Sequence, residues 1–129
     1  MPALEPMAGL RVVANPEALD RASWWGDRDV TVLRLAPDDA LAVGARRVDI
    51  DDEHAIVVEE AGFVGAWLTP EEFAAWVLPR IEWPLPTDRP TVAQGSVAGV
   101  PAKLWLRVTG GALLLTQAAY ADELTGRLG

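Results

Sequence analysis

Alternating apolar and polar positions predict strands along much of the chain. Over residues 30–36, the two valines lie on one face of an extended segment and the two leucines lie on the other face. Residues 37–39 are Pro-Asp-Asp, which is typical of a turn. The apolar run 40–45 fits either a second strand or a helical turn, and the polar run that follows, to residue 53, would bridge to the next strand.

A strand–strand–helix pattern then occurs twice. Its segments are 54–62, 63–69 and 70–78, and again 102–110, 111–116 and 117–129. Glycine at position 62 and the pair Gly110-Gly111 would permit the positive φ of hairpin turns. Two ββα units in one small chain predict an α+β fold with a single antiparallel sheet and both helices packed on one face.

The first of these helices has a strong start signal. Thr69 is a helix-capping residue, Pro70 has a preset φ for the first turn, and Glu72 stands where a capping-box acid belongs. The predicted buried stripe is Phe73, Trp76 and Val77. Pro79 should end the helix near Leu78, because proline removes a backbone donor and clashes with the preceding turn.

Residues 1–29 show no sustained period and contain three prolines. Asn15-Pro16-Glu17 has the cap, proline and acid of a helix start, so a short helix is expected there. We interpret 1–29 as an N-terminal arm and 30–129 as a single α+β domain. Residues 82–91, with three more prolines, should cross over as an extended loop, and 92–108 should form a broken strand or hairpin.

Composition narrows the classes of function. The chain has 129 residues, half of them apolar, which suits one folded domain. It has no cysteine, which excludes disulfides and cysteine-ligated metals. A net charge of −8 argues against nucleic acid and anionic lipid as partners. No apolar run is long enough to span a membrane, and the first residues lack the pattern of a signal peptide, so we expect a cytoplasmic protein.

Residues for catalysis or metal binding are sparse. His54 is the single histidine, and Ser23 and Ser96 are the only serines, neither in a nucleophile motif. The acids between Asp49 and Glu60 approach the spacing of a calcium loop, but His54 stands where that loop needs a glycine. We therefore expect no catalytic residues, no bound cofactor and no metal in this chain.

The six tryptophans are more informative. Trp67, Trp76 and Trp105 fall on predicted elements, which places them in the core. Three others, Trp24, Trp25 and Trp83, fall in the predicted arm and in the proline-rich crossover. Tryptophan in such segments is costly to leave in water and is enriched at binding hot spots. We interpret these three as partner-binding residues; alternatively, they pack on the domain's own sheet.

Several stretches resemble one protein family. Residues 33–43, a leucine-containing strand followed by Pro37-Asp38-Asp39, resemble the strand and turn of the gamma subunit of heterotetrameric sarcosine oxidase. Further matches follow in the family's order: 55–58 and 64–68, 74–85 with Trp83-Pro84-Leu85, 92–94, 97–105 and 118–124. The resemblance covers about residues 30–128. Ala40 replaces a tryptophan of the family pattern, and Thr69-Pro70 replaces Gly-Pro.

The resemblance implies a non-catalytic accessory subunit. That family is similar to the folate-binding aminomethyltransferase of the glycine cleavage system, so an aminomethyltransferase-like or ferredoxin-like α+β fold is expected. In such oxidases the larger subunits hold FAD, FMN, NAD and tetrahydrofolate, and the gamma-type chain packs against them. The partners implied are larger flavoprotein subunits.

Two other functions stay open at this stage. One is a freestanding protein of the same fold that binds folate or another small molecule, although no carboxylate can be assigned to a pterin ring. The other is an independent enzyme, which the single histidine and two serines disfavour. An isolated chain with uncovered tryptophans is also expected to be able to self-associate.

Overall fold

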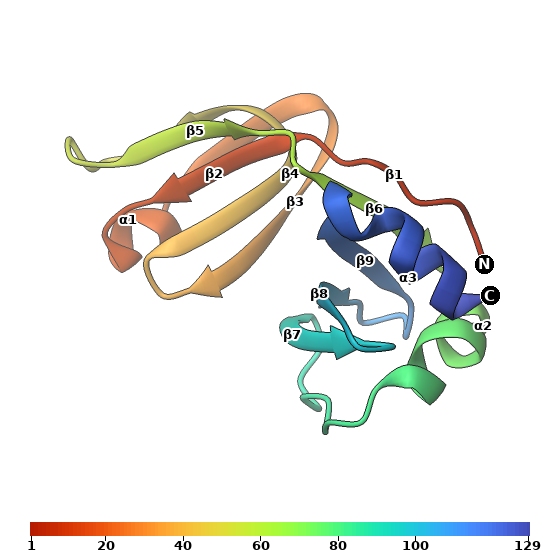
Figure 1. Ribbon diagram of the computed structural model, residues 1–129. Helices are drawn as coiled ribbons and strands as arrows, with labels where there is room; N and C mark the ends of the chain where they lie inside the picture. Colours follow the sequence, from red (N-terminus) through yellow and green to blue (C-terminus); the bar gives the residue numbers. More distant parts are fainter. The chain divides into compact units, whose positions relative to one another are not determined.

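The computed structural model describes all residues, 1–129, and has an α+β fold with two antiparallel sheets (Figure 1). The chain forms two compact units. The small unit comprises Met7–Ala61, and the large unit comprises Met1–Pro6 with Gly62–Gly129. Each unit has its own sheet and its own cluster of buried apolar side chains.

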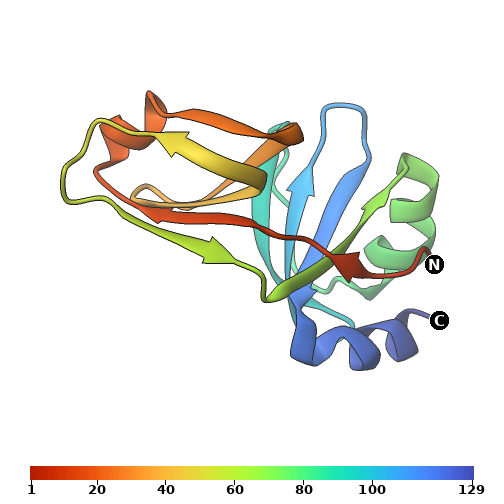
Figure 2. The same ribbon diagram turned by 90° about the horizontal axis from the view of Figure 1, so that it is seen from above.

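The small unit is a four-stranded sheet of order β3-β4-β2-β5. Its elements are β2 (Gly9–Val13), α1 (Pro16–Asp20), β3 (Ser23–Ala36), β4 (Asp39–Asp49) and β5 (Ile56–Glu60). All neighbouring strands are antiparallel. Figure 2 shows β2 and β5 side by side, with β5 at the border of the sheet. The predicted strand over 30–36 is confirmed as part of β3, and the run 40–45 is a strand.

The core of the small unit lies between one face of this sheet and α1. Leu10 and Val12 of β2 pack in one buried cluster with Leu19 of α1 and with alanines of β4. The helix begins as predicted, because the side-chain oxygen of Asn15 accepts a hydrogen bond from the backbone N–H of Glu17.

Strand β3 is interrupted by a large bulge. Gly26 pairs with Ala45 and Thr31 pairs with Val43, so residues 27–30 of β3 lie opposite Gly44 alone. Gly44 has a φ of +86°, which an L side chain rarely adopts. An added Cβ there would also lie 3.1 Å from the carbonyl oxygen of Asp29. The bulge therefore depends on glycine at position 44.

The large unit is a five-stranded sheet of order β1-β6-β9-β8-β7. Its strands are β1 (Glu5–Pro6), β6 (Phe63–Leu68), β7 (Thr91–Val97), β8 (Val100–Leu106) and β9 (Ala112–Gln117). Its helical segments are α2 (Pro70–Glu72), η1 (Phe73–Val77), η2 (Leu78–Arg80), η3 (Ala118–Tyr120) and α3 (Ala121–Leu128). The proline-rich residues 81–90 are irregular, and the hairpin expected over 92–108 is formed by β7 and β8.

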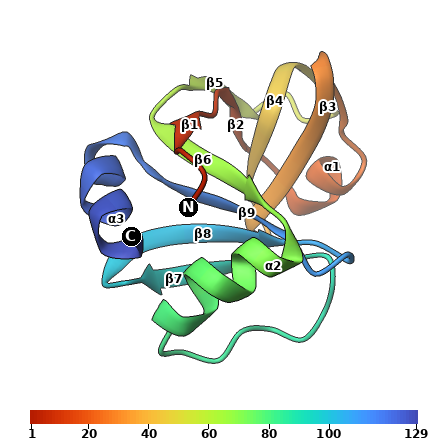
Figure 3. The ribbon, with the colours of Figure 1, turned by 90° about the vertical axis from the view of Figure 1, so that its right-hand side faces the viewer.

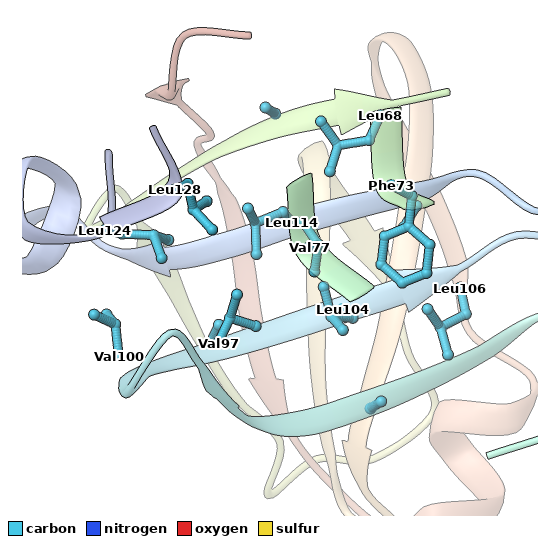
Figure 4. Packing of buried hydrophobic residues seen from close by; sticks show 14 residues of the cluster. Leu68, Phe73, Val77, Val97, Val100, Leu104, Leu106, Leu114, Leu124 and Leu128 are labelled. Atoms are coloured by element: carbon cyan, nitrogen blue, oxygen red, sulfur yellow. The ribbon is translucent and has the colours of Figure 1, made fainter. Parts of the chain in front are cut away.

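The helical residues that follow β6 and those that follow β9 lie on the same face of the large-unit sheet (Figure 3). Their apolar side chains meet those of the strands in one buried cluster (Figure 4), whose larger members are Leu68, Phe73, Val77, Val97, Val100, Leu104, Leu106, Leu114, Leu124 and Leu128. The predicted capping box is confirmed, with Thr69 Oγ1 accepting from the Glu72 N–H at 3.1 Å and Glu72 Oε1 accepting from the Thr69 N–H at 2.9 Å.

The expectation of a single sheet is wrong. The strand–strand–helix pattern predicted that β5 and β6 form one hairpin, but they belong to different sheets. β5 pairs with β2, and β6 pairs with β1 and β9. The second ββα unit exists as β8, β9 and α3. Residues 1–29 do not form a separate N-terminal arm, since they supply β1, β2, α1 and the start of β3. The chain passes from one compact unit to the other between residues 6 and 7 and between residues 61 and 62. The sequence predicted a single boundary between residues 29 and 30.

Replacing Gly126 with alanine is expected to stabilise the protein by about 0.5–1 kcal/mol. Gly126 lies inside α3, and a Cβ built on it has no neighbouring atom within 4 Å. Alanine would therefore restrict the unfolded chain without a clash in the folded one. Urea unfolding monitored by tryptophan fluorescence measures the change, and a stability equal to or below that of the wild type would contradict it.

Candidate protein-docking surface

Two of the three predicted partner-binding tryptophans lie in the small unit. Trp24 and Trp25 are consecutive residues near the start of β3 and pair with Val48 and Arg47 of β4. Because neighbours on a strand point to opposite faces, the two indoles diverge. Trp24 is half-buried against the small-unit core, and Trp25 is 44% exposed.

An arginine covers part of the exposed indole. The guanidinium carbon of Arg47 lies 4.2 Å from the centre of the Trp25 ring, which is the geometry of a cation–π contact. This pair leaves the remaining surface of Trp25 in water. Tryptophan and arginine are the side chains most enriched at the energetic centres of protein interfaces.

The tryptophans border a hollow of about 420 Å³ beside the β3 bulge. We call this region the tryptophan surface; its lining residues are Trp24, Trp25, Gly26, Arg28, Asp29, Val30 and Val32. Its lining combines aromatic and valine side chains with the charged residues Arg28 and Asp29 of the bulge. A surface with both apolar and charged groups suits contact with another protein.

The charges next to this surface are exposed and partly paired. Arg46 Nη1 lies 2.8 Å from Asp27 Oδ2, with both side chains about three-quarters exposed. Such a pair stabilises the fold little, because water screens it. The same groups can therefore exchange partners when another protein approaches.

The third predicted partner residue, Trp83, lies in the large unit and contacts its own sheet. Its ring covers Gly95, where an added Cβ would lie 2.5 Å from the indole. Its Nε1–H donates to the carbonyl of Ser96 at 2.8 Å. These contacts explain a half-buried tryptophan in a proline-rich segment, and a role of Trp83 in binding another protein stays a prediction.

The expectation that Trp67 belongs to the core is wrong. Trp67 of β6 is 44% exposed, and the guanidinium of Arg107 lies 5.3 Å from its ring centre. Trp67 and Trp105 both pair with Leu113 of β9, so they share the sheet face opposite to that of Leu114 and the helices. Trp105 is half-buried there, and Trp76 packs against the edge of the large-unit core.

The residues considered for catalysis do not form a reactive set. His54 is exposed, and its Nε2 lies 3.3 Å from Glu53 Oε1. The carboxylate of Asp52 already accepts hydrogen bonds from the backbone N–H of Asn15 and of His54. These hydrogen bonds lower the pKa of Asp52. No group of three or more acids and histidines is placed to hold a metal ion.

Two further hollows lie one on each unit. One, of about 350 Å³, lies on the large unit at Phe63 and Thr116; there Lys103 Nζ donates to Gln94 Oε1 at 2.9 Å. The other, of about 580 Å³, lies on the small unit between the bulge and Glu59. The latter offers carboxylates, but Asp27 is already paired with Arg46.

No family model matches the chain, and no curated protein matches it. The longest helix of the chain is far too short and too polar to cross a bilayer.

Sequence reasoning missed two features, one within the tryptophan surface and one beside it. The bulge at 27–30 has no local signal beyond its charges, because it is created by the register between β3 and β4. Arg47 looked like part of a polar connection, whereas it lies in β4 directly opposite Trp25. An aromatic residue and an arginine on neighbouring strands could have been suspected only once the pairing was known.

Proposed function

We propose that this chain is a non-catalytic, gamma-type accessory subunit of a sarcosine-oxidase-like, amine-oxidising flavoprotein complex. The observation that carries the proposal is the half-exposed Trp25 with Arg47 stacked on it, on a surface that holds no reactive set. The resemblance of residues 30–128 to the gamma subunit supplies the kind of partner. FAD, FMN, NAD and tetrahydrofolate would then be bound by the partner subunits.

The chemistry of the tryptophan surface supports docking by burial. Removing the exposed part of Trp25 from water would add to the hydrophobic driving force of association. Arg47 can keep its contact with the indole while it turns a donor toward a carboxylate of the partner. The charged residues of the bulge would form the rim and restrict the orientation of the partner.

Removal of this anchor tests the proposal. The chain would be co-expressed with the larger flavoprotein subunits of the same organism and isolated through an affinity tag, with flavin absorbance as the readout. Trp25→Ala is expected to weaken association about 30-fold, which corresponds to about 2 kcal/mol for a tryptophan at the centre of an interface. Trp67→Ala is the matched control, because Trp67 is equally exposed and also lies beside an arginine.

Two results would contradict the proposal. Recovery of the tagged chain without any flavoprotein would remove the accessory-subunit function. Equal weakening by Trp67→Ala and Trp25→Ala would remove the tryptophan surface as the docking site. A titration of tryptophan fluorescence with tetrahydrofolate separates the other function, since a saturable change in the isolated chain would favour a freestanding folate binder.

A further inference from the structure

Strand β5 is an open edge of the small-unit sheet. It pairs with β2 alone, in a continuous register from Val13–Ile56 to Gly9–Glu60. In an antiparallel pair, the backbone groups of an edge strand that point away from its one neighbour have no strand to bind. Within the small unit, no strand lies on the outer side of β5 (Figure 2).

Three of the five side chains of this edge are apolar and lie on both faces, and the strand ends in Glu59 and Glu60. Ile56 is 60% exposed, Val57 is 43% exposed and Val58 is 49% exposed. Val13, directly opposite Ile56 on β2, is 38% exposed and extends the apolar surface of one face. Three consecutive β-branched residues at a sheet edge favour pairing with a further strand.

The other sheet edges carry the devices that prevent such pairing. β7 is covered by Trp83, whose ring lies on Gly95 and whose Nε1–H binds the carbonyl of Ser96. β1 has two residues, one of them Pro6. β3 is broken by the bulge with its three charged residues. β5 contains no proline, no lysine and no bulge.

The charges around β5 restrict what can bind there. Residues 49–60 contain six acids and no lysine or arginine. Asp51 and Glu53 precede the apolar residues and Glu59 follows them, all three exposed. An occupant with basic residues at both ends would meet opposite charge, whereas a second copy of β5 would bring two acidic segments together.

We propose that β5 binds an extended segment of another protein as an additional strand. The segment would alternate valine or isoleucine with small polar residues such as threonine, and it would have lysine or arginine at both ends. Backbone hydrogen bonds would provide the affinity, and contacts with Ile56, Val57 and Val58 would provide the register. This inference is independent of the proposed function, because it involves neither the tryptophan surface nor a flavoprotein.

A synthetic peptide of alternating valine and threonine with a pair of lysines at each end tests the inference on the full chain. Fluorescence anisotropy measures affinity, and amide chemical shifts locate the site. The lysine peptide is expected to shift the amides of β5 and to bind at least tenfold more tightly than the same peptide with glutamates at its ends. Higher salt should weaken it, because the flanking charges are exposed.

Substitutions in the edge complete the test. Val58→Lys is expected to weaken the lysine peptide at least tenfold, because it puts a like charge on the edge, and Ile56→Lys should act in the same way. Val108→Lys is the matched control: the same change at a 73% exposed valine of the large unit should leave affinity unchanged. Circular dichroism verifies that each variant is folded.

Several outcomes would overturn the inference. These are a wild-type chain that does not bind the lysine peptide, equal binding of the glutamate peptide, and shifted amides away from β5. Unchanged affinity in both folded edge variants would do the same. A wild-type dimer in sedimentation that Val58→Lys converts to a monomer would assign the edge to a second copy instead.

Discussion

Leu114→Ala is expected to lower the free energy of unfolding by about 3–4 kcal/mol. Leu114 is fully buried in β9, between Leu104 of β8 and Ala66 of β6. Its side chain points to the face that carries the helical segments, in one cluster with Val77 and Leu124 (Figure 4). Neighbouring strands flank Leu114 and helical side chains pack over it. Truncation therefore leaves a cavity that the surrounding residues can fill only in part.

Urea unfolding followed by tryptophan fluorescence measures this loss, and Val108→Ala is the control. Val108 is 73% exposed in the loop between β8 and β9, so its truncation should change stability by less than about 0.5 kcal/mol. A loss below about 1 kcal/mol for Leu114→Ala would mean that the large-unit core is less tightly packed than the structure indicates.

Gly9→Ala is expected to destabilise the small unit by about 3 kcal/mol or more. A Cβ at position 9 would lie 2.1 Å from the backbone carbonyl oxygen of Ala42 and 3.0 Å from the Cα of Val43. Gly9 pairs with Val43 in the register of β2 and β4, so the clash involves backbone that cannot rotate away. The strand β2 would have to move from its place between β4 and β5.

Hydrogen exchange resolved by residue is the measurement for Gly9→Ala, because it reports on the small unit separately. Amides of β2 and β4 should exchange markedly faster than in the wild type. Gly126→Ala is the control with the same chemical change at an unobstructed site, and it should not accelerate exchange in the small unit. Unchanged protection of β2 in Gly9→Ala would show that the backbone of Ala42 yields at little cost.

Short-range signals predicted the structure well where they act alone. Asn15 caps α1, Thr69 and Glu72 form the capping box, and the helical residues that start at Pro70 end shortly after Pro79. Each of these depends on side chains within a few positions of the backbone that they stabilise. The turn at 37–38 and the strand before it follow from the same kind of information, whereas the apolar run 40–45 fitted either a strand or a helical turn.

Pairing between strands was not predictable in the same way. Residues 56–60 and 63–68 both have strand patterns, and the short link with Gly62 suggested a hairpin. The structure assigns them to different sheets, since β2 and β9 supply their partners. Alternation specifies which residues share a face, but it does not specify which strand lies alongside.

The tryptophans of the candidate site show the same difference between what neighbouring residues predict and what strand packing decides. The sequence selected Trp24 and Trp25 as candidates, and the structure places them together on the small unit with one of them half-exposed. It assigned Trp67 to the core because the residue lies on a strand. Trp67 lies on the sheet face away from the helices, where Leu113 is fully buried and Trp67 is 44% exposed. Exposure of a strand residue depends on what covers its face, which is a long-range property.

The amino-acid sequence by itself determined the α+β class, the helix starts and most strand segments, because capping, turn chemistry and alternation are properties of neighbouring residues. Only the tertiary structure decided that there are two sheets, that Arg47 meets Trp25 across β3 and β4, and that β5 is left as an open edge. These features arise from contacts between residues far apart in the chain, whose free energy depends on how whole strands pair and pack.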